Sequence, residues 1–218
     1  LANIFVMSRA SFLAMIFGIV ILFVIWPFIK DNKAEKKVII FNLAIRCVVA
    51  AIMAVVLFLF FMSFLQNIQR YDIAGSNSAR MDMSRIAING FLKHPIFGSG
   101  PGTFINLTET DSWFMKAYGG VPLDSHGIAQ KILVEQGIIG VIVFGCIVFA
   151  LIKEYYLFMR NTDSVEDRIS VSVLFVLVAS CFFIELFNTT YYSCKLWLPI
   201  GIYIAGLNIY RKNYDFKW

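Results

Sequence analysis

Residues 127–152 read GIAQKILVEQGIIGVIVFGCIVFALI, and this stretch decides the fold class. A helix needs about 20 predominantly apolar residues to cross a bilayer, and this run satisfies that length. Its first two turns contain Gln130, Lys131 and Glu135, whereas no charge follows Gly137 within the stretch. We therefore predict a transmembrane helix that meets lipid only from about Gly137 onward.

Four other apolar segments resemble this one. Three are long and nearly free of charge, residues 11–29, 38–65 and 169–187, and a shorter one covers 196–210. Apolar residues make up 59% of the chain and charged residues 15%, whereas roughly a quarter of residues are charged in soluble domains. A β-barrel would alternate apolar and polar residues, which these segments do not. We predict an all-α integral membrane protein with about five transmembrane helices.

The predicted helices enclose one long polar loop. Residues 1–65 would contain two helices, 66–126 the loop, and 127–218 three helices with a short tail. Basic residues cluster in the connections 30–37 and 153–168 and in the tail, whereas 188–195 contains one lysine. Because short basic connections stay in the cytoplasm, the loop is expected outside. This orientation explains the net charge of +5, so membrane lipids are expected as neighbours and nucleic acid is not.

The chain starts at Leu1, and an apolar segment follows without the pattern of a signal peptide. We expect the sequence to be a fragment of a larger polytopic protein, with further spans before Leu1. The four cysteines are dispersed, and the two histidines lack companion ligands at metal-binding spacing. We therefore expect neither a disulfide nor a protein-bound metal.

An amphipathic helix is predicted in the outer loop. Asn77 or Ser78 would cap it, and His94-Pro95 would end it after Lys93. Helical spacing separates a polar stripe from an apolar face, which comprise Asp82, Arg85, Asn89 and Lys93 on one side and Met83, Ser84, Ala87, Ile88 and Phe91 on the other.

Arg80 falls in the middle of this apolar face. An unpaired guanidinium there would cost several kcal/mol, so we expect Arg80 to meet an anion. The alternative is that the first turn frays and Arg80 extends to water or lipid headgroups.

Two further features of the loop are candidates for phosphate binding and for proton transfer. The glycine-rich segment 95–102 could hold phosphate oxygens, but Pro101 lacks an N–H and no strand-to-helix unit surrounds it, which favours a tight turn. His126, at the start of the next span, could accept a proton from a hydroxyl group, with Asp124 or Glu135 orienting it. A lone histidine at a helix start is also commonly a capping residue.

Four elements, in order, resemble the O-antigen ligase and O-antigen polymerase family, membrane enzymes that move lipid-linked glycans. The elements are Ser8-Arg9-Ala10-Ser11, Arg80 ahead of His94-Pro95-Ile96-Phe97-Gly98-Ser99-Gly100, Ser125-His126, and Glu135-Gln136-Gly137-Ile138-Ile139-Gly140. The resemblance covers roughly residues 8–152. The family usually has asparagine after its histidine, where this chain has Gly127.

The resemblance implies transfer or polymerisation of a glycan carried on a polyprenyl diphosphate. The reaction would occur at the outer face of the bacterial cytoplasmic membrane, in O-antigen lipopolysaccharide, capsule or exopolysaccharide assembly. Arg9 and Arg80, with Arg85 as a weaker candidate, would bind the diphosphate. Because these arginines would stabilise the leaving diphosphate, no metal or other cofactor is expected. His126 would be the general base.

The acceptor would be a glycan or a lipid core. Asp124, Glu135 and Glu185 are candidates for orienting the histidine or completing the acceptor site. A different class of function, a transporter or flippase of lipid-linked glycans, would place charged residues near the bilayer midplane in repeated halves. The ionisable residues here concentrate in the outer loop instead, which favours the transferase.

Overall fold

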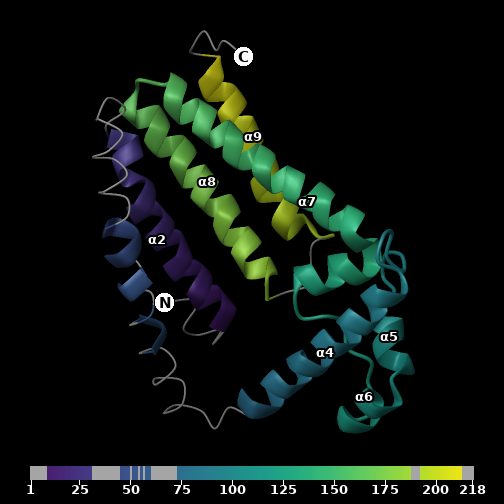
Figure 1. The fold of residues 1–218 in the computed structure, drawn as a ribbon. Helices are drawn as coiled ribbons and strands as arrows, with labels where there is room; N and C mark the ends of the chain where they lie inside the picture. The colour runs from purple at the N-terminus through teal and green to yellow at the C-terminus, as the bar shows by residue number, and fades with distance from the viewer. Residues whose placement is uncertain are drawn as a thin grey trace. The chain divides into compact units, whose positions relative to one another are not determined.

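The computed structural model describes residues 9–30, 45–49, 51–53, 55, 57–59, 73–187 and 192–212. Their regular secondary structure is entirely helical (Figure 1), which confirms the all-α prediction for this part of the chain. Ser8 and the basic connection at 31–37 lie outside the described residues. The labelled helices are α2 (Arg9–Lys30), α4 (Ile73–Lys93), α5 (Phe104–Thr110), α6 (Ser112–Ala117), α7 (Ile128–Asn161), α8 (Val165–Glu185) and α9 (Cys194–Arg211).

Two helices, α7 and α8, are long and apolar enough to cross a membrane by length and composition. Shorter apolar helical stretches cover Leu13–Pro27 and Ile45–Leu59. The helix α9 coincides with the fifth predicted segment. A total of five spans, and their orientation, stay predictions.

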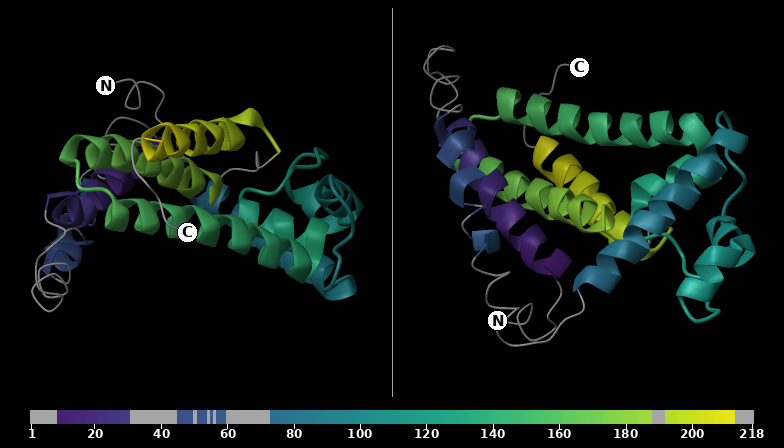
Figure 2. Two further views of the ribbon diagram at one scale, coloured as in Figure 1. Left: turned by 90° about the horizontal axis from the view of Figure 1, so that it is seen from above. Right: turned by 60° about the horizontal axis from the view of Figure 1, so that its bottom comes forward.

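The chain forms two compact units, and the first contains Leu1–Gln69, Leu151–Ile184 and Tyr192–Trp218. Within it α2 and α8 run side by side (Figure 2), and the rings of Phe17 and Phe183 stack with their centroids 4.3 Å apart. Phe175 of α8 stacks in turn on Tyr155, from the end of α7, at 4.3 Å. Aromatic packing therefore joins the helices of this unit.

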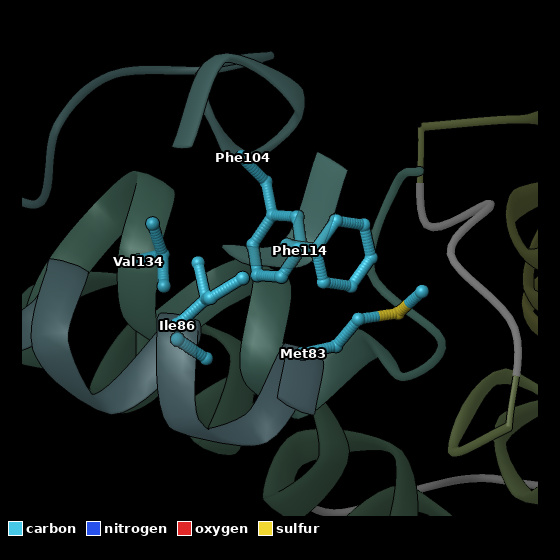
Figure 3. Packing of buried hydrophobic residues seen from close by; sticks show 6 residues of the cluster. Met83, Ile86, Phe104, Phe114 and Val134 are labelled. Carbon is cyan, nitrogen blue, oxygen red and sulfur yellow. The ribbon is translucent and has the colours of Figure 1, made fainter. Parts of the chain in front are cut away.

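The second unit contains Arg70–Ala150 and Glu185–Tyr191. Its core draws on four helices, as Figure 3 shows: Met83 and Ile86 come from α4, Phe104 from α5, Phe114 from α6 and Val134 from α7. Each of these side chains is at most 5% exposed. The second unit is therefore a small packed body with its own core.

The structure corrects two details of the predicted loop helix. α4 begins at Ile73, ahead of the predicted cap, although it ends at Lys93 before His94-Pro95 as expected. Ile88, assigned to the packed face, is 60% exposed, while Ile86 is 5% exposed. The buried flank is rotated because α5 packs against Gly90, where an added Cβ would lie 2.6 Å from Leu107 Cδ1.

Candidate active site

The helix α7 is broken at Gly137. Gly137 has φ 64° and ψ −160°, a conformation open essentially to glycine alone. Such a break interrupts the helical hydrogen bonds and leaves carbonyls without intrahelical partners. The amides of Ser99 and Gly100 donate to the carbonyls of Val134 and Glu135 at 2.8 and 2.9 Å. The glycine-rich turn thus supplies hydrogen-bond donors to two carbonyls at the break in α7.

The same turn also accepts hydrogen bonds from beyond the break. Ile138 N donates to Pro95 O at 2.9 Å, and Ile139 N donates to Ile96 O at 3.3 Å. A Cβ on Gly137 would collide with the backbone of Ile96. The motifs at 94–100 and 135–140 therefore form one structural element. Because the amides of Ser99 and Gly100 are engaged, this arrangement favours the tight turn over a phosphate cradle.

Buried charges connect α7 to the residues before His126. Glu135 is 1% exposed, its Oε1 accepts a hydrogen bond from Phe104 N at 3.3 Å, and it lies 3.7 Å from Lys131 Nζ. Lys131, 4% exposed, is also hydrogen-bonded to Asp124. Buried charges persist where they are paired in this way. Glu135 thereby caps α5, and Asp124 is fixed beside His126.

His126 is exposed immediately before α7. Partial desolvation lowers the pKa of its imidazole below the usual 6.5, the positive charge of Arg80 lowers this pKa further, and Asp124 opposes both effects. The charges of Arg80 and Asp124 therefore act on the ring in opposite directions. The imidazole is therefore neutral at neutral pH, the form that accepts a proton.

Arg80 is partly buried on α4. Its Nε is buried without a hydrogen-bond partner in the described part of the chain, and so is Oε1 of Gln130 on α7. Ser84 links these two residues, because Gln130 Nε2 donates to Ser84 Oγ at 2.7 Å and Ser84 Oγ donates to Arg80 O at 2.8 Å. The link reaches the main-chain carbonyl of Arg80 and not its guanidinium. A buried unsatisfied polar group costs about 1–3 kcal/mol, so each of the two atoms could bind a polar ligand.

A mainly apolar cavity adjoins Ser84 and Gln130. It has a volume of about 240 Å³ between α4 and α7, and its lining comprises Ser84, Ala87, Ile88, Phe91, Gln130 and Leu133. The side-chain amide of Gln130 therefore lies beside an apolar space, one helical turn along α4 from Arg80.

Gly127 lets the backbone of Leu186 approach more closely than a residue with a Cβ would allow. A Cβ at this position would lie 2.9 Å from the carbonyl oxygen of Leu186, closer than real Cβ contacts. This contact explains why glycine follows His126 here. The asparagine expected from the family resemblance would require the backbone to shift.

Three further candidates are Arg85, Arg9 and Glu185. Arg85 lies 3.4 Å from Asp111 and its guanidinium lies 5.1 Å from the centre of the Trp113 ring. Arg9 is the first residue of α2, and its side chain lies outside the described residues. Glu185 is 3% exposed at the end of α8. The roles of these three residues stay predictions.

Sequence reasoning missed Gln130 and Lys131, which it treated only as polar residues at the start of a span. The spacing of Lys131 and Glu135, one helical turn apart, was the available signal for their pairing. No comparable signal marked Gln130, because its partner Ser84 is 46 residues away in the sequence.

The chain matches the family model described as O-antigen ligase over residues 1–145. No curated protein and no solved structure matches it. The matched region includes Arg80, His126 and both sides of the break at Gly137. The resemblance inferred from the ordered motifs is confirmed, and the chain belongs to the O-antigen ligase family.

Proposed function

We propose that this protein transfers a glycan from a polyprenyl diphosphate to a hydroxyl of a glycan or lipid core, without a metal ion. The proposed reaction occurs at the outer face of the bacterial cytoplasmic membrane, in polymerisation or ligation. The observation that supports it best is that Arg80 Nε is buried without a hydrogen-bond partner among the described residues, while the positive charge of Arg80 lowers the pKa of His126. Arg80 would thus supply the cation that binds the diphosphate, and His126 the neutral base.

Arg80 would bind the diphosphate of the donor. A guanidinium stays charged throughout the reaction and can engage phosphate oxygens through two parallel hydrogen bonds. As the sugar leaves, negative charge grows on the departing diphosphate, and a fixed cation stabilises that charge. Arg9 is proposed as a second cation and Arg85 as a weaker one.

His126 would accept the proton of the acceptor hydroxyl. The acceptor oxygen attacks the anomeric carbon, the bond from that carbon to the diphosphate oxygen breaks, and the diphosphate leaves with the bonding electrons. The hydroxyl proton passes to the imidazole, and Asp124 stabilises the resulting cation. Direct displacement inverts the anomeric configuration. A neutral imidazole at neutral pH supports this assignment.

The apolar cavity beside Gln130 would accommodate the first part of the polyprenyl tail. Its lining includes Ala87, Ile88 and Leu133. Placing hydrocarbon here and diphosphate at Arg80 follows the order of groups in the donor. The outer-loop unit would then bind the donor across its head and the start of its tail.

Substitution in the complete gene tests this proposal. Arg80→Ala and His126→Ala should each reduce transfer by about 10²–10⁴-fold, the usual contribution of a general base or of a charge that stabilises the transition state. Arg160→Ala, an exposed arginine at the end of α7, is a matched control. The measurement is surface glycan together with its lipid-linked precursors.

The precursors separate the possible activities. Single repeat units left on the acceptor indicate a lost polymerase, and accumulated lipid-linked polymer indicates a lost ligase. If the protein were a transporter, its loss would instead leave lipid-linked glycan on the inner leaflet, inaccessible to glycosidase added outside. Unchanged glycan in both site variants would contradict the mechanism.

A further inference from the structure

Three of the most exposed side chains of α4 are apolar. Met81 is 74% exposed, Ile88 60% and Leu92 67%. At 100° per residue they fall within about 40° of one another around the helix axis. The core residues Met83 and Ile86 lie on the opposite side of the helix. α4 therefore has two apolar faces, one packed in the core and one, the apolar stripe of Met81, Ile88 and Leu92, that faces away from it.

The turn after α4 extends this exposed apolar surface to α7. Ile96 and Phe97 are both exposed, Phe97 by 75%. α4 meets α7 at this turn (Figure 1), where Ile139 N donates a hydrogen bond to Ile96 O at 3.3 Å. Ile138 and Ile139 are themselves exposed. Exposed apolar residues thus follow one another from α4 through the turn to α7, all within the second unit.

The composition of α7 indicates what covers this surface. α7 is long and apolar enough to cross a membrane. Its exposed side chains beyond the break include Ile142 and Val143, and no charged residue occurs between Gly137 and Lys153. Exposed apolar side chains on a helix of this kind face lipid. The turn is hydrogen-bonded to α7 where that surface begins, so Phe97 lies at the depth where α7 enters the bilayer.

Polar residues border the apolar stripe on one side. Arg85 and Lys93 are exposed there, and the guanidinium of Arg85 lies 5.1 Å from the centre of the exposed Trp113 ring. Long basic side chains extend from apolar surroundings to lipid headgroups, and tryptophan is enriched at headgroup level. An apolar stripe bordered in this way is typical of a helix that lies in a membrane interface.

We propose that α4 lies in the surface of the bilayer that α7 enters, with the apolar stripe inserted among the lipids. The partner is lipid rather than another protein chain, because the exposed apolar residues lead through Phe97 to the part of α7 that lipid covers. This inference does not depend on the proposed function.

The proposed docking also defines the surroundings of the apolar cavity. Ile88 belongs to the apolar stripe and also lines the cavity between α4 and α7. The cavity would then open toward the bilayer. Under the proposed function, the prenyl tail of the donor could enter it directly from the lipid.

Spin labels on the full-length protein in lipid nanodiscs test the docking. The native cysteines are replaced by serine, and Ile88→Cys or Leu92→Cys carries a nitroxide. Oxygen concentrates in hydrocarbon, whereas a polar nickel chelate stays in water, so the collision rates with the two reagents give the depth of the label. Both labels should lie about 5–10 Å inside the headgroup boundary, the usual depth of an interfacial helix.

Two further labelled positions calibrate this measurement. Asn89→Cys, exposed on the polar side of α4, is the matched control and should collide more with the nickel chelate than the stripe positions do. Ile142→Cys, exposed on α7, is the reference for lipid. Thermal unfolding confirms that each labelled variant is folded.

The outcomes separate lipid from water and from protein. If the labels at Ile88 and Leu92 collide with the nickel chelate as often as the label at Asn89 does, water covers the stripe and the inference is wrong. Labels that are immobile and protected from both reagents show that protein covers the stripe, which also overturns the inference. These depths are measured without glycan transfer, so they stand whether or not Arg80→Ala abolishes it.

Discussion

Replacing Gly137 by alanine should separate the glycine-rich turn from α7. The φ of 64° and ψ of −160° at this residue are strained for any side chain. The new Cβ would also press against Ile96 O and Gly98 N. The turn must then move away from the helix, and the hydrogen bonds across the break are lost or lengthened.

The expected cost follows from these contacts. Backbone strain in this region contributes about 1–3 kcal/mol. Four hydrogen bonds join the turn to α7, and losing two of them adds about 2 kcal/mol at roughly 1 kcal/mol each. The sum is about 3–5 kcal/mol, equivalent to roughly 10²–10⁴-fold faster amide exchange in this region.

Hydrogen exchange of the full-length protein measures this local opening. The amides of Ser99 and Gly100 report on it directly, since both donate to α7. The matched control is Gly145→Ala on the same helix, where a Cβ meets nothing within 4 Å. This substitution should be neutral or stabilise by up to about 1 kcal/mol, because alanine favours helix over glycine.

If the amides of Ser99 and Gly100 are equally protected in Gly137→Ala and Gly145→Ala, the predicted separation of the turn from α7 is wrong. The turn would then be held by contacts other than those across the break. Loss of transfer without faster exchange would point instead to a direct chemical role for the turn.

Two other predictions concern the buried charges. Asp124→Asn removes the charge that raises the pKa of His126, so this pKa falls and the acidic limb of the kcat/KM profile moves to lower pH; a move to higher pH would contradict the assignment. Lys131→Met leaves the carboxylate of Glu135 buried without its cation and should destabilise the protein by about 3–5 kcal/mol. The double variant Lys131→Met/Glu135→Gln should recover part of this loss in thermal unfolding, and no recovery would argue against the pairing.

Part of the site could be predicted from the sequence. Arg80 was identified by its place on a helix face, and His126 by its position at the start of a span. In the structure the charge of Arg80 lowers the pKa of His126. Neither Gln130 nor Lys131 was identified, because their significance depends on Ser84 and Asp124 in other segments. A pattern along the chain does not report such pairings.

The helical class, the apolar segments, the end of α4 at His94-Pro95 and the ordered family motifs could all be predicted from the sequence. These are local properties, set by length, hydrophobicity and backbone preference. The packing of the helices was needed to show that Ile86 rather than Ile88 is buried, and that the turn at 95–100 forms hydrogen bonds across the break at Gly137. Burial and hydrogen-bond pairing depend on which elements pack together, so residues far apart in the sequence decide them jointly.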